Sequence, residues 1–493
     1  MNGPRARETV QKLWNASKSL QGGGVSYYEY VTELTYLLLL KMLAEVSEKP
    51  PHADRKLEQR LPADYRWGAL RKLEGEPRLV FYRGLLVALG DPTKVKYDLV
   101  NQVFTDAKTS LTKATALTSL ITTIDAVDWY AAEEDGLGDL YEGLLERTTS
   151  ERKSKAGQYF TPRPLIDTIV DLVKPDPGEV IQDPAAGTGG FLIAAHRAIS
   201  GQTDELMKLS PDDAFFQRNN AYRGAELITG THRLNTMNLL LHGIEQPIAC
   251  VDTLTSDGEA LGKADLILTN PPFNKFPERV TRSDFSITAG AAKGPLPFME
   301  HIVRALKDGG RAAVVVPDNV LFEDNMGREL RTWLMDRCDL HTILRLPTGI
   351  FYAQGVKTNV MFFTKISETA EHATRQVWFY DMRAQMPSFG KTRVLTADDF
   401  KAFADAFGKD PLGKAKRKDQ GENGRFRSFT RAEIAKRNDN LDISWLRDDD
   451  EEIEEGLTEP DDIAAAILGH LRAALEEIES VADELAEAGE VEA

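Results

Sequence analysis

The chain has 493 residues, of which 42% are hydrophobic and 28% are charged, and its formal net charge is −17. This composition predicts a globular protein of two to four domains with a sizeable core. The start lacks the apolar core of a signal peptide, the run at Leu37–Leu40 is too short to span a bilayer, and two cysteines build no disulfide framework. We therefore expect a cytoplasmic protein without a membrane, and one too acidic to hold nucleic-acid phosphates without a basic face or partner.

Helical periodicity fills residues 1–148, which we assign to an all-helical N-terminal domain. Apolar residues recur at helical spacing in Tyr30–Met42, Phe81–Leu89 and Leu117–Ala126, as they do around Val10–Trp14. Breaks are expected at the glycines of residues 22–24. Such stripes usually indicate a helical bundle without chemistry of its own; docking to a DNA backbone or to another subunit is the alternative use.

A polar, basic stretch rich in turn formers, residues 151–164, marks the next boundary. Thr161 is expected to N-cap a helix that has Pro162 at its first position and continues through Leu165 and Ile169. By itself the stretch is a linker followed by a helix cap. Its position directly before a glycine-rich loop favours a second role, covering a bound ligand.

The glycine-rich loop runs from Asp183 to Gly190, between a short strand at residues 179–182 and a helix that begins at Phe191. Strand, glycine turn and helix form the first unit of a doubly wound α/β sheet, where ligands bind at the carboxyl ends of strands. Asp183 can meet an ammonium group. The next strand-end acid, Glu226, lies later than a dinucleotide fingerprint requires. It would hold ribose hydroxyls, or it is simply a surface residue.

Strands and helices continue to alternate down to about Lys365, where we expect the sheet to end. This alternation predicts a parallel sheet with helices on both faces. Asp252 follows a strand at residues 249–251 and also lies at a carboxyl end. The segment Phe276–Pro297 is either a mobile lid or a plain loop. Further strands are expected at residues 264–268, 311–316, 342–346 and 359–364, and helices at residues 233–241, 298–306 and 330–336.

The turn after residue 268 reads Thr-Asn-Pro-Pro-Phe-Asn. Its two prolines must end the strand, because each lacks an N–H group and fixes φ. The Asn270 amide oxygen and the Pro271 carbonyl can accept two hydrogen bonds from one exocyclic amine, and Phe273 offers a face to a planar base. The rigid turn holds these groups without reorganisation. The simpler interpretation is a tight turn with Phe273 in the core.

A glycine loop followed by Asn-Pro-Pro-Phe resembles the S-adenosylmethionine-dependent N6-adenine DNA methyltransferases. Nearly the whole chain resembles, more closely, the modification subunit of type I restriction–modification systems. The resemblance implies methyl transfer from S-adenosylmethionine to a flipped adenine in double-stranded DNA, which protects host DNA from restriction. The segments that carry it are Gly24–Tyr27, Tyr141–Leu145, Gly157–Leu165, Asp183–Leu192, Met237–Gly243, Asn270–Phe273, Gly310–Phe322, Leu346–Phe351 and Gly355–Val360.

The resemblance also implies roles for single residues. The catalytic turn would be Asn270, Pro271, Pro272 and Phe273. Adenine N6 is a poor nucleophile because its lone pair is delocalised, and two accepted hydrogen bonds would localise it, without a metal or a covalent intermediate. Phe273 would stack on the base. Cofactor binding is implied for Gln158, Tyr159, Phe160, Thr161, Pro162, Arg163, Asp183, Gly187, Thr188, Gly189, Gly190, Glu226 and Asp252.

Residues 149–446 form the expected catalytic domain, and residues 447–493 an acidic linker with a C-terminal helix. The basic run Lys414–Lys418 is either a solvated loop or a phosphate contact. Leu468 to Leu485 repeat as a heptad seam that needs a partner, in another subunit or in this chain. No base-reading domain is evident. The resemblance implies a separate specificity subunit clasped by two copies of this chain, with a restriction subunit joining for cleavage.

Two other functions remain open at this point. Release-factor glutamine methyltransferases also use an Asn-Pro-Pro turn, on a protein amide, but they lack the long helical domain and the heptad tail. A scaffold that binds S-adenosylmethionine without catalysis is the second, and the intact turn Asn270–Phe273 argues against it. No Gly-x-x-x-x-Gly-Lys-Ser/Thr loop of a translocating nuclease occurs in the sequence.

Overall fold

The computed structural model describes residues 26–46, 61–126, 141–145, 161–347, 349–351, 357–384, 386, 389 and 393–446. Several predictions concern positions outside these described residues. They are the helix near Val10–Trp14, the implied cofactor contacts of Gln158, Tyr159 and Phe160, and the heptad seam, and they stay predictions.

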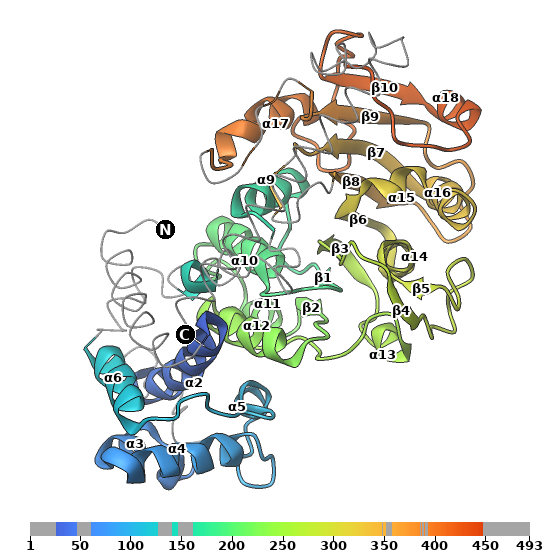
Figure 1. Ribbon diagram of the computed structural model, residues 1–493. Coiled ribbons are helices and arrows are strands. Elements are labelled where there is room, and N and C mark those ends of the chain that lie inside the picture. The colour runs from blue at the N-terminus through green and yellow to red at the C-terminus, as the bar shows by residue number, and fades with distance from the viewer. Residues whose placement is uncertain are drawn as a thin grey trace, which may run out of the picture.

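The N-terminal part is helical, as predicted, and lies at one end of the molecule (Figure 1). Its helix α2 is buried almost continuously from Tyr30 to Leu40, because the neighbouring helices cover it on several sides. A helical turn at residues 141–145 joins this core, where the Tyr141 hydroxyl lies 2.7 Å from Thr35 Oγ1. The elements are α2 (Tyr27–Val46), η3 (Ala63–Tyr65), α3 (Trp67–Lys72), α4 (Gly75–Leu89), α5 (Asp98–Phe104) and α6 (Ala114–Asp125).

The following part is built on an eight-stranded sheet with the order β10-β9-β7-β8-β6-β3-β1-β2 (Figure 1). β2, β1, β3 and β6 pair in parallel, as predicted. The strands are β1 (Ile181–Asp183), β2 (Tyr222–Gly224), β3 (Ala264–Thr269), β6 (Leu306–Pro317), β7 (Cys338–Arg345), β8 (Thr358–Lys365), β9 (Gln376–Asp381) and β10 (Phe426–Thr430).

Helices cover both faces of this sheet, which confirms the doubly wound α/β class. Side chains alternate across the strands, so Leu266 and Leu268 of β3 pack with α9 and α10, whereas Ile267 packs with α14 and α16. The helices are α9 (Arg163–Val173), α10 (Gly190–Thr203), α11 (Pro211–Asn219), α12 (Thr229–Leu241), α13 (Ser256–Glu259), α14 (Pro295–Ala305), α15 (Asp318–Phe322), α16 (Met326–Arg337), η4 (Ala397–Phe400), α17 (Lys401–Phe407) and α18 (Arg431–Lys436).

Three predictions about the sheet were wrong. β8 runs antiparallel to β6 and β7, because no crossover helix separates β7 from β8 in the described residues. The sheet does not end near Lys365, since β9 pairs with β7 and β10 pairs with β9. The strand expected at residues 249–251 is reduced to one bridge, between Ala225 and Ala249.

The segment Phe276–Pro297, for which the sequence left a lid or a loop open, contains a small hairpin of β4 (Phe276–Arg279) and β5 (Ala292–Lys293). Its connecting residues are anchored, since the buried Glu300 carboxylate accepts hydrogen bonds from the backbone amides of Ser286 and Thr288. No helix in the described part of the chain combines the length and the apolar character needed to cross a membrane.

Candidate active site

The Asn-Pro-Pro-Phe turn lies at the carboxyl end of β3, between β1 and β6 in the sheet. β3 ends at Thr269, directly before the turn, as two consecutive prolines require. Asn270 is only 8% exposed. β1 and β3 are parallel neighbours in which Gln182 pairs with Ile267, so the glycine loop and the turn leave the same edge of the sheet side by side.

Thr161 does not cap α9, so this prediction was wrong. α9 begins at Arg163 and its N-cap position is Pro162, with no side-chain capping bond. The Thr161 side chain instead faces the turn, where its Oγ1 accepts a hydrogen bond of 2.9 Å from Asn270 Nδ2. The sequence gives no signal for this contact, because its two partners are 109 residues apart.

Phe273 is largely buried and belongs to the core on the α9 face of the sheet. Its ring meets that of Phe351 edge to face, with centroids 5.6 Å apart and an interplanar angle of 84°. Phe351 lies in the segment after β7, and the sequence had given it no role of its own. The core interpretation of Phe273 therefore has support, and its stacking on a base stays a prediction.

Two asparagines of α12 hold the glycine loop by hydrogen bonds to its backbone. Asn235 Nδ2 donates to the Gly187 carbonyl at 3.0 Å, and Asn238 Nδ2 donates to the Thr188 carbonyl at 2.8 Å. Gly187 and Gly189 have φ values of 52° and 90°, which favour glycine. A Cβ at Gly187 would meet no atom within 4 Å, so open space lies beside this residue for a ligand to approach the backbone.

Acidic side chains stand at neighbouring strand ends. The Glu226 carboxylate accepts hydrogen bonds from the Gly187 amide at 3.0 Å and the Ile228 amide at 2.8 Å, and burial raises its pKa. Burial also raises the pKa of Asp183 to about 7, against the hydrogen bond donated by the Ala185 amide. Asp252 accepts a hydrogen bond from the Leu254 amide and forms an ion pair with Lys293 of β5.

Leu227 and Ile228, directly after Glu226, are 59% and 58% exposed. They were not among the predicted site residues, although two apolar residues directly after a strand-end acid are a visible signal in the sequence. They provide an apolar surface beside the acid, which suits a flat aromatic ring.

Arg163, one of the implied cofactor contacts, ties parts of the protein together. It forms an ion pair with Glu142 of the helical turn at residues 141–145, and its Nη1 donates to the Gly190 carbonyl at 3.3 Å. Arg197 of α10 pairs with the same carboxylate at 3.2 Å. Burial lowers the pKa of Arg163.

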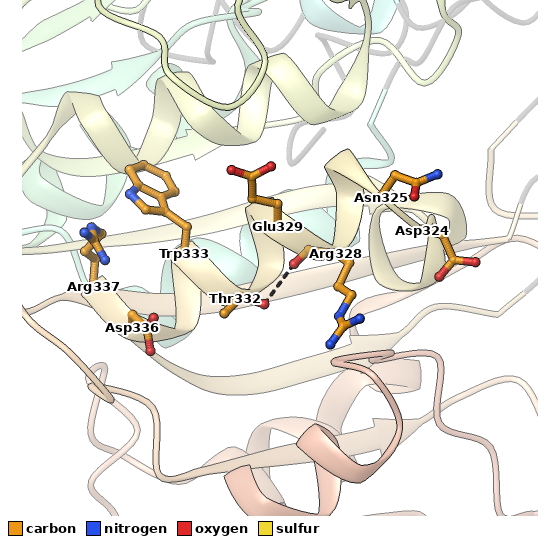
Figure 2. Close-up of a pocket in the computed structure, with 8 residues that line it drawn as sticks. All are labelled: Asp324, Asn325, Arg328, Glu329, Thr332, Trp333, Asp336 and Arg337. Carbon is orange, nitrogen blue, oxygen red and sulfur yellow. Dashed lines mark hydrogen bonds between the residues drawn. The ribbon is translucent and has the colours of Figure 1, made fainter.

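A hollow on α16 is a weaker candidate for the site. Figure 2 shows that its lining side chains leave one helix and the turn before it in different directions, and none of them comes from the glycine loop or the Asn-Pro-Pro-Phe turn. Acidic and basic groups are interspersed along it, and the guanidinium groups of Arg304 and Arg337 lie over the Trp333 ring. The hollow is therefore part of the exposed surface of a charged helix, and we place the candidate active site at the carboxyl ends of the strands instead.

Known proteins resemble the chain along almost its whole length. A family profile described as N-6 DNA Methylase matches residues 132–455, more than half of the chain. The methylase subunit of the type I restriction enzyme StySJI from Salmonella typhimurium is 45% identical, covering 99% of this chain and 97% of the relative. The chain belongs to the N-6 DNA methylases. The methylase subunit of EcoKI from Escherichia coli K12 is 44% identical, covering 98% of this chain and 96% of its own length.

Solved structures agree with this membership. The crystal structure of the EcoKI M protein matches with a TM-score of 0.57 and 42% identity, covering 97% of this chain and 96% of that protein. A chain from work on complex assembly and conformational transition of the type I R-M system matches with a TM-score of 0.73 and 25% identity, covering 97% and 98%. The predicted resemblance to type I modification subunits is confirmed.

As an N-6 DNA methylase, the chain is an adenine-specific DNA methyltransferase whose methyl donor is S-adenosylmethionine. Its residues fit this cofactor. Open space beside Gly187 allows a ligand to lie against the backbone, and Glu226 offers a carboxylate for ribose hydroxyls. The exposed pair Leu227 and Ile228 offers a surface for the adenine ring.

Proposed function

We propose that the turn Asn270–Phe273 performs the methylation of adenine N6, as part of a type I modification complex. The observation that supports this most directly is the place of Asn270. Its amide lies at the carboxyl end of β3, and the glycine loop follows the adjacent strand β1. The amide nitrogen donates a hydrogen bond to the Thr161 hydroxyl. The part of the site that would bind the methyl acceptor, adenine, and the part that would bind the methyl donor, S-adenosylmethionine, thus lie at the same edge of the sheet.

In the proposed reaction the chain positions and polarises the target amine. Asn270 Oδ1 and the Pro271 carbonyl accept the two N–H groups of adenine N6, which localises the nitrogen lone pair. The bound cofactor supplies an electrophilic methyl group on a sulfonium. The two prolines fix the backbone of the turn and with it the Pro271 carbonyl, and the Phe273 ring, which packs edge to face on Phe351, would stack on the base. The base must leave the duplex to reach this point.

The proposed cofactor site is the glycine loop with its flanking acids. Glu226 would hold the ribose hydroxyls, Asp183 would face the ammonium group, and Leu227 and Ile228 would pack on the adenine ring. Asp252 is held by Lys293 and would lie where cofactor and base meet. Gly187, Thr188, Gly189 and Gly190 would supply the backbone surface, and residues 158–163 would cover it. The bond from Arg163 to the Gly190 carbonyl supports a place for that segment beside the loop.

For partners we propose double-stranded DNA, a specificity subunit, a second copy of this chain and, for cleavage, a restriction subunit. The names of the relatives, which are subunits of type I restriction enzymes, support this assembly. The net charge of −17 also favours a partner that supplies DNA contacts. Domain limits at residues 1–148, 149–446 and 447–493 remain part of the proposal.

Exchange of Asn270 for alanine tests the proposed chemistry. Loss of one preorganised polar partner should lower the rate of methyl transfer roughly a hundredfold or more. Tritium transfer from labelled cofactor to cognate DNA measures the rate, and calorimetry should show unchanged cofactor binding. Asn274→Ala is the matched control, because Asn274 follows the turn and is exposed. An Asn270→Ala protein within a few fold of wild type would show that Asn270 is structural.

A further inference from the structure

Thr161 connects a segment before α9 to the turn that carries Asn270. Both residues are 8% exposed, and the Asn270 Nδ2 to Thr161 Oγ1 distance is 2.9 Å. Thr161 is also tied to the glycine loop, because Arg163, two residues later, donates to the Gly190 carbonyl. A three-residue stretch therefore contacts both halves of the site.

The Asn270 amide has two ends of nearly equal shape and opposite hydrogen-bonding character. The prolines that follow fix its backbone, but they do not fix the torsion that exchanges oxygen and nitrogen. The amine of the target adenine donates hydrogen bonds, so the Asn270 amide must turn its oxygen toward this amine. The nitrogen, which is then turned toward the protein, needs an acceptor because a buried donor without a partner is costly.

We propose that Thr161 is a positioning residue that sets the orientation of the Asn270 amide. Its hydroxyl oxygen accepts from Nδ2 and so sets which end of the amide is the oxygen that would accept from the amine of the target base. This inference rests on the proposed function of Asn270. It gives Thr161 a role toward the methyl acceptor, whereas the family resemblance had placed Thr161 with the cofactor.

Thr161→Val keeps the shape of the side chain and removes the acceptor. In the full chain within its complex, we expect kcat to fall about 10- to 100-fold, with the KM for DNA and the calorimetric affinity for S-adenosylmethionine unchanged. Thr161→Ser keeps the hydroxyl and should retain the wild-type rate. Thr168→Val is the matched control on α9, because the Thr168 hydroxyl bonds only within its own helix, to the Pro164 carbonyl.

A double-mutant cycle separates positioning from general damage. If Thr161 acts through the Asn270 amide, Thr161→Val should cause no further loss of rate in an Asn270→Ala background. An equal loss in both backgrounds would overturn the inference, as would weaker cofactor binding with unchanged kcat. If the valine variant does not fold, Thr161→Cys, which keeps a weak acceptor, should be slow while Thr161→Ser is not, and equal rates for the two would also overturn it.

The cycle keeps the two proposals distinguishable. An active Asn270→Ala protein would contradict the proposed chemistry itself. An inactive Asn270→Ala protein together with a Thr161→Val protein of wild-type rate would contradict only the role of Thr161.

Discussion

Asp183 carries its carboxyl group at the end of β1, where burial raises its pKa from the ordinary 3.8 to about 7. The unfolded chain loses this proton near pH 3.8 and the folded chain near pH 7, so the folded protein holds an extra proton between these values. The free energy of unfolding contributed by Asp183 is therefore highest below the interval and is lost as pH rises through about 7.

We predict that Asp183→Asn flattens this dependence, because an amide does not titrate. Between about pH 5 and about pH 8 the thermal midpoint of the cofactor-free wild type should fall, and that of the variant should fall less. Differential scanning calorimetry of both proteins at matched ionic strength checks the difference. Parallel curves would show that Asp183 does not hold the raised pKa.

At the scale of elements, α12 joins the helical part to the cofactor loop. Arg233 donates to the carbonyls of Val103 and Thr105, at 2.7 and 2.6 Å, and Met237 lies in the core of the helical part. From the same helix, Asn235 and Asn238 bind the loop carbonyls. A substitution in α12 should therefore alter the affinity for the cofactor, although the substituted residue does not contact the cofactor.

We predict that Asn235→Leu weakens the affinity for S-adenosylmethionine about tenfold. The Gly187 carbonyl loses its hydrogen-bond donor, and the glycine loop is then no longer held in its shape. Calorimetry measures the affinity. Thr236→Val is the control, since the buried Thr236 hydroxyl bonds within α12, to the His232 carbonyl. The prediction fails if both variants bind the cofactor like wild type, or if both lose affinity equally.

Elements were predictable where periodicity is local and strong. Helices α2, α4 and α14 and strand β3 appear where the sequence placed them, because one apolar stripe or run sets each of them. The reversal of β8 and the addition of β9 and β10 depend on pairings between distant strands, which local patterns do not contain. Arg417 is a similar case: it lies in the basic run Lys414–Lys418, yet its guanidinium packs over the Phe407 ring.

The site shows the same limit at smaller scale. The turn at Asn270 and the loop at Gly187 were found because prolines and glycines mark them in the sequence. The hydroxyl of Thr161 was assigned to a cap, the usual local use of threonine before a helix. Its actual partner is brought near by the sheet, and Asn235 and Asn238 reach the loop in the same way, from a helix that carries no motif of its own.

For the whole molecule, the prediction concerns the segment through which the chain binds its partners. The heptad seam predicted for Leu468–Leu485 lies outside the described residues, and we propose that it docks the specificity subunit, because the apolar stripe of such a predicted helix needs a partner. We predict that a chain ending at Glu455 binds S-adenosylmethionine but does not co-purify with the specificity subunit. Size-exclusion chromatography of the co-expressed proteins tests this, and an intact complex would exclude the seam as the dock.

The central claim, that the Asn270 turn methylates adenine N6 in DNA, is tested most directly in cells. Genomic DNA of a host that carries the operon is sequenced for N6-methyladenine, with this gene intact, deleted, and restored as wild type or as Asn270→Ala. We predict that one sequence motif loses its methylation on deletion and regains it only with the wild-type gene. Methylation that persists without the gene, or that Asn270→Ala restores in full, would contradict the account.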